Sequence, residues 1–264
     1  MADHFTAHPR PIAWTTEGDG PAVVLLHGLG GDRQFWANEI TDLSRDRRVI
    51  AVDLRGSGGT PTTHGGHAIS DLADDVFTVL DESGVGAAAV IGFSMGGLVA
   101  QSMAVRQPHR VTRIVLASTY AVMNMQARMF LDAVREVVIA DHSLRAVYPL
   151  VRPWLFSLDF LSTPANAVWL GAVDDENEPP EAWLAQYQAQ RDFDGRADLN
   201  RITAPTLILC GDEDRLVDAS DVSVLAGGIR GASITWFRGS GHLINLEQPG
   251  RFLSETRAFL EADS

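Results

Sequence analysis

Short apolar runs alternate along the chain with stretches whose apolar residues recur every three or four positions. Continuous apolar runs predict strands buried on both faces, and the three-or-four spacing predicts amphipathic helices. This alternation indicates an α/β fold with a mostly parallel sheet between layers of helices. The predicted strands are 22–26, 49–54, 87–93, 111–118, 205–210 and 233–237. The predicted helices are 34–43, 70–80 (with Ser70 as its N-cap), 95–107, 219–229 and 249–262.

The alternation is interrupted between the fourth and fifth predicted strands. Residues 120–198 contain helical segments and no convincing strand, so we expect a core domain of 1–119 and 199–264 with a helical cap inserted at 120–198. Ten of the 20 aromatic residues lie within 120–193. Most of them would build the core of the cap, and some would line an apolar substrate cavity facing the sheet. The candidate substrate-binding residues are Phe93, Met123, Phe130, Trp154 and Leu216.

Composition excludes several classes of function. The net charge of −13 at pH 7 disfavours nucleic acid or an anionic membrane as a partner. All 21 basic residues are arginines, which excludes a catalytic Schiff-base lysine, a lysine-anchored pyridoxal cofactor and a Walker A lysine. The single cysteine, Cys210, excludes an intrachain disulfide and a cysteine metal cluster. We therefore expect no cofactor and no metal.

The N-terminal segment is polar, and no apolar run approaches the roughly 18 residues of a membrane span. These two features predict a cytoplasmic protein. The sequence leaves its oligomeric state open.

A candidate nucleophile follows the third predicted strand. Residues 92–97 read Gly-Phe-Ser-Met-Gly-Gly, a G-x-S-x-G motif between a strand and a helix. In this context a sharp turn lifts the hydroxyl of Ser94 clear of the sheet, and small neighbours allow the strand and the helix to approach closely. The helix N-terminus adds free N–H groups beside the hydroxyl.

A serine nucleophile needs a base, and the base needs an acid that orients it. His242 follows the last predicted strand in the sequence Gly-Ser-Gly-His, at the same sheet edge as Ser94. Four acidic residues follow the preceding strand or lie near it. They are Asp212, Glu213, Asp214 and Asp218. We favour Asp214 as the acid and expect Asp212 to support the turn or cap a helix.

A glycine-rich turn, His27-Gly28-Leu29-Gly30-Gly31, follows the first predicted strand. The backbone N–H groups of Leu29 and of Met95, the residue after the serine, are the predicted oxyanion-hole donors. A dinucleotide-binding loop is disfavoured because Arg33 stands where the third glycine of G-x-G-x-x-G belongs. His27 itself is expected to be a buried structural residue.

Taken together, these motifs resemble those of the α/β-hydrolase superfamily, and the resemblance covers nearly the whole chain outside the cap. The resemblance implies an eight-stranded, mostly parallel sheet, a helical lid and a Ser94–His242–Asp214 triad. Within the superfamily the sequence is similar to bacterial esterases and lactonases, including enol-lactonase-like and acyl-lactone-cleaving members. Two loops depart from the usual pattern. Residues 53–60 read Asp-Leu-Arg-Gly-Ser-Gly-Gly-Thr, with Ser57 in place of a histidine, and Asp218 replaces a common proline.

The expected function is hydrolysis of an apolar carboxylic ester or lactone through an acyl-enzyme. A serine nucleophile argues against haloalkane dehalogenases and epoxide hydrolases, which use an aspartate. A C–C bond hydrolase is a less favoured alternative, because such enzymes often carry asparagine at the position of Phe93. Phe93 is compatible with a perhydrolase. An acyltransferase or natural-product tailoring enzyme of the same fold, and a ligand sensor with low turnover, remain open.

Overall fold

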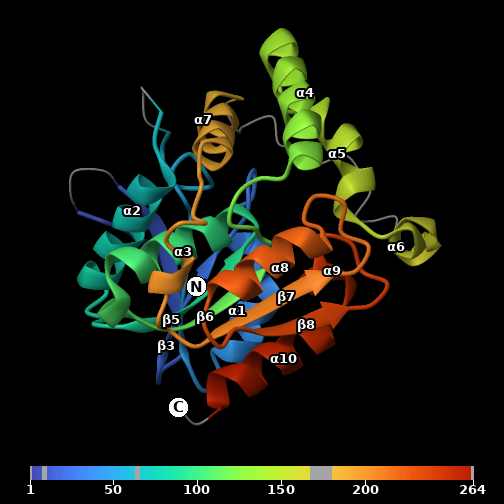
Figure 1. The fold of residues 1–264 in the computed structure, drawn as a ribbon. Helices are drawn as coiled ribbons and strands as arrows, with labels where there is room; N and C mark the ends of the chain where they lie inside the picture. The colour runs from blue at the N-terminus through green and yellow to red at the C-terminus, as the bar shows by residue number, and fades with distance from the viewer. Residues whose placement is uncertain (1, 8–10, 63–65, 167–179, 263–264) are drawn as a thin grey trace.

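A computed structural model describes residues 2–7, 11–62, 66–166 and 180–262, and its strands form one eight-stranded sheet (Figure 1). The strand order is β1-β2-β4-β3-β5-β6-β7-β8. β2 runs antiparallel to both neighbours, and the other adjacent pairs are parallel. The strands are β1 (Ala2–Phe5), β2 (Ala13–Glu17), β3 (Ala22–Leu26), β4 (Arg48–Val52), β5 (Ala88–Phe93), β6 (Val111–Ala117), β7 (Thr206–Gly211) and β8 (Ser233–Phe237). The predicted fold class is confirmed.

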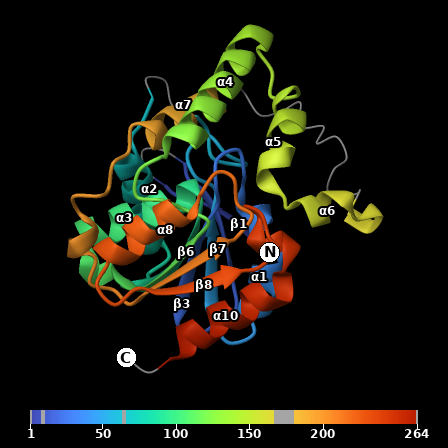
Figure 2. The same cartoon turned by 45° about the vertical axis from the view of Figure 1, so that its right-hand side comes forward.

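Helices cover both faces of the sheet (Figures 1 and 2). One face packs against α2 (Ile69–Glu82), α3 (Met95–Arg106) and α8 (Ala219–Gly228). The other packs against α1 (Ala37–Leu43), α9 (Ile244–Glu247) and α10 (Pro249–Glu261). Short 3-10 turns are η1 (Arg33–Trp36), η2 (Pro108–Arg110) and η4 (Leu199–Arg201).

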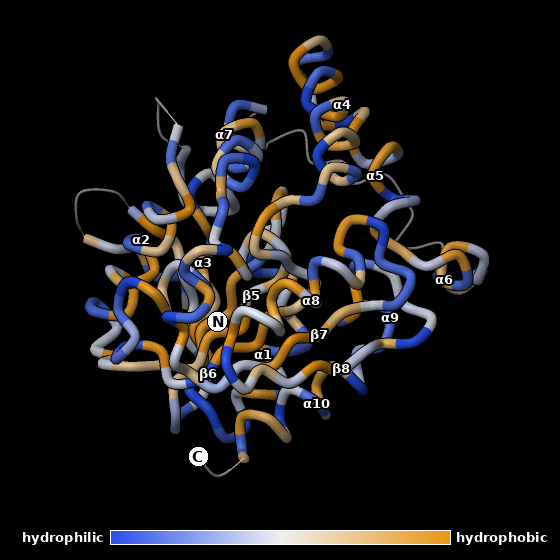
Figure 3. The backbone as a smooth tube through the Cα atoms, viewed as in Figure 1, coloured by the Kyte–Doolittle hydropathy of each residue, from blue (hydrophilic) through white to orange (hydrophobic). Residues whose placement is uncertain are grey.

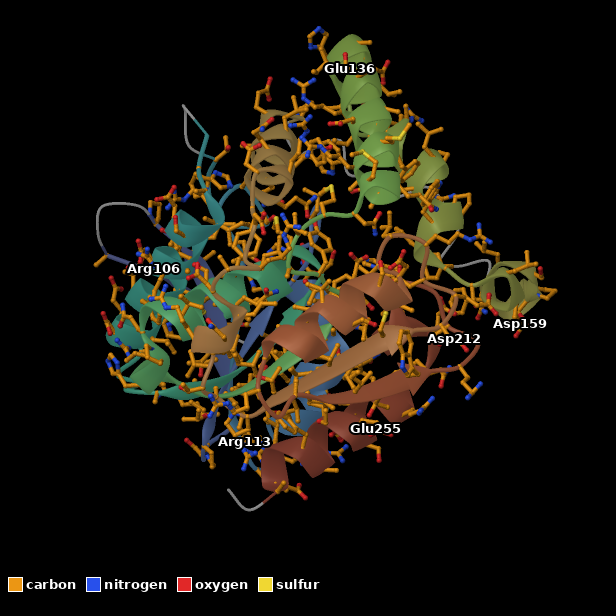
Figure 4. All side chains as sticks on the ribbon, viewed as in Figure 1. Arg106, Arg113, Glu136, Asp159, Asp212 and Glu255 are labelled. Carbon is orange, nitrogen blue, oxygen red and sulfur yellow. The ribbon has the colours of Figure 1, made fainter. Side chains whose placement is uncertain are left out.

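The central strands are apolar on both sides because each side meets a helix layer. In β3, Val24 and Leu26 belong to one core, while Val23 and Leu25 belong to the other. The tube of β5, β6 and β7 is correspondingly hydrophobic along most of its length (Figure 3). Charged side chains such as Arg106, Glu136 and Asp159 lie at the outside of the molecule (Figure 4). Among the described residues, no helix combines the length and apolar composition that crossing a bilayer requires.

In the N-terminal third of the chain, the structure differs in two details from the predictions made from the apolar pattern. α2 begins at Ile69, so Ser70 lies inside the helix and its prediction as the N-cap is wrong. The N-cap is Ala68, whose backbone N–H donates to the Asp71 carboxylate at 2.8 Å. That carboxylate, three residues into the helix, supplies the half of a capping box that binds the N-cap N–H, and Ala68 itself makes no side-chain capping bond. The edge strand β1 and its neighbour β2 carry polar residues and gave no continuous apolar run.

The segment between β6 and β7 contributes α4 (Met125–Asp141), α5 (Val147–Leu155), α6 (Leu158–Ser162) and α7 (Pro180–Arg191). Both ribbon views place α4, α5 and α7 together, at the opposite end of the molecule from α10 (Figures 1 and 2). Residues 167–179 of this segment, including Trp169, lie outside the described residues. The division of the chain into a core domain and a 120–198 cap stays a prediction.

A buried carboxyl group lies between the sheet and the α1–α10 layer. Glu39 of α1 is 1% exposed. Burial raises the pKa of Glu39 from 4.5 to about 7, and the neighbouring side chain of Asn245 offsets this only in part. A buried carboxyl group with a raised pKa holds its proton in the folded state after the unfolded chain has released it.

Glu39 should therefore make folding stability fall as the pH rises. Between pH 4.5 and 7 the folded chain binds more protons than the unfolded chain at this group, so the free energy of unfolding decreases with pH. The loss should amount to roughly 3 kcal/mol and should be absent from Glu39→Gln. Urea unfolding of both proteins from pH 4.5 to 8 measures it. Glu136→Gln, on the exposed surface of α4, is the control and should keep the wild-type slope. Identical slopes in wild type and Glu39→Gln would contradict the assignment.

Candidate active site

Ser94 lies at a strained turn between β5 and α3. Its backbone has φ 49° and ψ −114°, a region that non-glycine residues rarely adopt. The surrounding glycines make this turn possible. A Cβ on Gly92 would lie 2.4 Å from Gly96 O, one on Gly96 would lie 2.2 Å from Leu26 O, and one on Gly97 would lie 2.5 Å from Thr119. Ser94 is half-buried and borders a cavity.

His242 and Asp214 meet in the loops that follow β8 and β7. His242 Nδ1 lies 2.8 Å from Asp214 Oδ2, and the two side chains are 3% and 0% exposed. The other carboxylate oxygen accepts the N–H groups of Leu216 at 2.8 Å and Val217 at 3.0 Å. A carboxylate can only accept, so this pair holds the imidazole proton on Nδ1 and leaves the lone pair on Nε2. Nε2 is then available as a base.

The other acidic residues of this region have different partners. Asp212 accepts the N–H of Gly239 at 2.7 Å and so supports the turn after β8. Asp218 caps α8 through the N–H groups of Ser220 and Asp221. Glu213 accepts the N–H of Leu158 at 3.4 Å. Of these residues, Asp214 is the one that contacts the His242 ring.

The glycine-rich turn after β3 passes directly beside Ser94. A Cβ on Gly28 would lie 3.2 Å from Ser94 Cβ and 3.0 Å from the Phe93 ring. His27 fixes the turn through both ring nitrogens. Its Nε2 accepts the Leu54 N–H at 3.0 Å, and its Nδ1 donates to Gly28 O at 2.8 Å. Burial lowers the pKa of His27, which keeps the ring neutral in this role.

The two predicted oxyanion donors lie on either side of this contact. Leu29 follows Gly28 and lines the cavity, and Met95 is the first residue of α3 after Ser94. Within the part of the chain that the structure describes, neither amide N–H donates to a protein acceptor. Both are therefore free for a ligand, although their role as an oxyanion hole stays a prediction.

A cavity of about 810 Å³ connects Ser94, His242 and Leu29 with α4, α5 and α7. Its volume is in the range of pockets that hold drug-sized ligands. Three of the predicted substrate-binding residues, Phe93, Phe130 and Leu216, line it. Further lining residues that the motifs did not single out include Phe35, Tyr120, Tyr148, Leu155, Trp183 and Gln190.

Two predicted substrate-binding residues are not part of the lining. Met123 is 6% exposed and belongs to the hydrophobic core shared with α4. Trp154 stacks behind Phe130, with ring centroids 4.0 Å apart and an interplanar angle of 12°. Aromatic enrichment marks the segment but does not show which side of each helix faces the cavity. Trp154 therefore supports the Phe130 ring, which itself lines the cavity.

The end of α5 is bonded directly to the His242 loop. Leu155 O accepts the backbone N–H of His242 at 2.9 Å and of Leu243 at 3.1 Å. A Cβ on Gly241 would lie 2.6 Å from the backbone of Phe156, so only glycine fits there. Glu247 joins the same two segments, accepting from Gly241 N at 3.0 Å and from the Ser157 hydroxyl at 2.6 Å. The position of His242 thus depends on the inserted segment.

Gln186 of α7 ties the inserted segment to the opposite side of the cavity. Its fully buried amide donates to Arg55 O at 2.9 Å and to the Ser57 hydroxyl at 2.8 Å, and accepts from Gly30 N at 3.4 Å. Ser57 is the residue that replaces the family's usual histidine. This departure from the family pattern therefore forms part of the contact between α7 and the glycine-rich turn.

Residues 21–249 match the family model described as alpha/beta hydrolase fold, and the chain belongs to that family. The fold, with its eight-stranded sheet, and the strand–serine–helix turn agree with this assignment. The resemblance seen in the motifs is thereby confirmed, and the protein is a hydrolase of this family.

Named relatives act on more than one kind of bond. The chain is 31% identical over 258 residues to the "Putative carbamate hydrolase RutD" of Variovorax paradoxus (strain S110), covering 95% of this chain and 96% of the relative. It is 26% identical to "3-oxoadipate enol-lactonase 2" of Acinetobacter baylyi, covering 98% and 96%. The crystal structure of the enol-lactonase from Burkholderia xenovorans LB400 superposes with a TM-score of 0.88 at 25% identity, covering 96% and 97%.

Proposed function

We propose that the protein is a serine hydrolase that cleaves a neutral carboxylic ester or lactone in an apolar pocket roofed by a helical cap. The observation that carries the proposal is the His242–Asp214 pair, 2.8 Å apart, whose His242 borders the same cavity as the strained Ser94. A nucleophile, an oriented base and a wall of apolar side chains are the parts that acyl transfer to serine requires.

The reaction begins when His242 Nε2 takes the proton of Ser94 Oγ as the oxygen attacks the substrate carbonyl. The free N–H groups of Leu29 and Met95 donate hydrogen bonds to the carbonyl oxygen as negative charge develops on it. His242 then gives the proton to the leaving alkoxide oxygen, which leaves an acyl group on Ser94. In the second half of the reaction His242 takes a proton from a water molecule that attacks this acyl-enzyme, and it returns the proton to Ser94 Oγ as the carboxylic acid leaves. Losing one oxyanion donor typically costs about 2.7–4 kcal/mol of transition-state stabilisation, so these amides add a large contribution to that of the triad.

The apolar wall predicts a dependence on acyl length. Burying a methylene is worth roughly 0.8 kcal/mol, so kcat/KM should rise about three- to fourfold per carbon until the cavity is full. Steady-state hydrolysis of 4-nitrophenyl esters and simple lactones of graded acyl length measures this, with Ser94→Ala as the inactive control. A flat response, or a preference for charged acids, would contradict an acyl pocket beneath the cap.

A carbamate is the second candidate substrate class, because the relative of highest identity named above is called a carbamate hydrolase. Attack by serine on a carbamate carbonyl passes through the same tetrahedral geometry as attack on an ester. The same assay with 4-nitrophenyl carbamates of matched size separates the two. Faster release of nitrophenol from carbamates than from esters would favour this second candidate.

A further inference from the structure

One side of the cavity carries a polar pair. Tyr120, which follows β6, and Gln190, at the end of α7, both line the cavity. The Tyr120 hydroxyl donates to Gln190 Oε1 at 3.2 Å, and the two residues are 4% and 2% exposed. The apolar residues Phe130 and Leu131 of α4 line the same cavity. In a mostly apolar pocket, a few hydrogen-bonding side chains determine which polar group of a ligand is recognised.

The pair has unused hydrogen-bonding capacity. The Gln190 amide offers two N–H donors as well as its oxygen. Within the described residues, Nε2 of Gln190 donates to no protein acceptor, whereas the matching amide of Gln186, one turn earlier, is fully bonded. If the amide is turned so that its nitrogen meets Tyr120, one N–H still remains unused. Gln190 is 2% exposed and lines the cavity, so its unused N–H groups are available to a ligand bound there.

The pair is held in place close to Ser94. Thr119, which precedes Tyr120, donates through its hydroxyl to Ser94 O at 2.7 Å. Gln101 Nε2 donates to Tyr120 O at 2.9 Å. Burial raises the pKa of Tyr120, which keeps the phenol protonated and able to donate. Gln190 is fixed from the other side because Gln186 anchors α7 to the glycine-rich turn.

We propose that the Gln190 amide, oriented by Tyr120, donates to a second oxygen of the substrate, a carbonyl or ether oxygen on the acyl chain, apart from the bond that is cleaved. The proposal rests on the proposed function and narrows its substrate class. The substrate is then a neutral ester or lactone whose acyl group is apolar except for one internal acceptor oxygen. A charged group is disfavoured because the pair carries no formal charge.

The test uses pairs of 4-nitrophenyl esters of equal chain length. In one member of each pair the acyl chain is a plain hydrocarbon. In the other, one methylene of the chain is replaced by a carbonyl, and the position of this carbonyl varies from C3 to C8 across the panel. At one position wild type should prefer the oxo ester by about ten- to a hundredfold in kcat/KM, because a site built to donate a hydrogen bond discriminates against a ligand that cannot accept it. Gln190→Met, of similar length but without a donor, should abolish this preference.

Two further variants separate recognition from structure. Gln188 lies on the exposed surface of the same helix, so Gln188→Met should keep the wild-type preference for the oxo ester. Tyr120→Phe should lower the preference, since the hydroxyl that orients the Gln190 amide is gone. Equal loss on both members of a pair in Gln190→Met, or no oxo preference at any position in wild type, would overturn the proposal.

Binding measured without turnover keeps this proposal distinct from the proposed function. The same ester pairs are titrated calorimetrically into Ser94→Ala and into Ser94→Ala with Gln190→Met. Tighter binding of an oxo ester that depends on Gln190, in a protein whose wild type cleaves no ester, would refute the hydrolase mechanism and retain the second-oxygen site. Ester cleavage that depends on Ser94, without any preference for oxo esters in rate or binding, would support the hydrolase mechanism and refute the second-oxygen site.

Discussion

Ser94→Ala and His242→Ala are each expected to lower kcat for 4-nitrophenyl ester hydrolysis by about 10⁴- to 10⁶-fold, and the double variant should lose little more. The nucleophile and its base act in a single step, so either alone contributes almost nothing. The oxyanion donors and the cavity remain in all three variants, which should therefore keep a residual rate above that of the reaction in water.

The measurement is kcat for wild type, both single variants and the double variant, with thermal unfolding to show that each is folded. Ser94→Ala keeps a Cβ at the strained φ of 49°, so its stability should stay close to that of wild type. His109→Ala, an exposed histidine, is the matched control and should leave kcat unchanged. Losses that multiply in the double variant would mean that Ser94 and His242 do not share a step.

The sequence predicted the strands that are buried on both faces and the turn that holds Ser94. These features follow from local rules: continuous apolar runs give central strands, and the glycines around Ser94 are required because a Cβ there would lie as close as 2.2 Å to neighbouring backbone atoms. β1 and β2 were missed by the apolar pattern because both carry polar residues, β1 at the edge of the sheet and β2 beside it. They were expected only through the resemblance to the family.

The candidate site was predictable in its motifs but not in its walls. The choice of Asp214 among neighbouring acids depends on which carboxylate reaches His242, and that is a property of two loops distant in sequence. Met123 and Trp154 were placed in the pocket by composition, whereas Met123 packs in the hydrophobic core before α4 and Trp154 stacks on Phe130, both outside the lining. Tyr120 and Gln190 are separated by 70 residues, and no local pattern pairs them.

Asp214→Asn should lower kcat by about 10⁴-fold while leaving the fold intact. The asparagine oxygen can still accept the N–H groups of Leu216 and Val217, which preserves the loop. Its NH₂ group then faces His242 Nδ1 and can only donate there. The ring must carry its proton on Nε2 instead, and in that tautomer it cannot take the proton of Ser94.

The neighbouring acids supply the matched controls for this prediction. Asp212→Asn and Asp218→Asn retain an oxygen that accepts the backbone N–H groups these side chains now bind, so kcat should change less than about threefold. Ester kinetics and circular dichroism on the three variants decide the matter. If Asp212→Asn or Asp218→Asn shows the large loss and Asp214→Asn does not, Asp214 is not the group that orients His242. The 2.8 Å contact would then be structural, and the base would depend on a different acid for its tautomer.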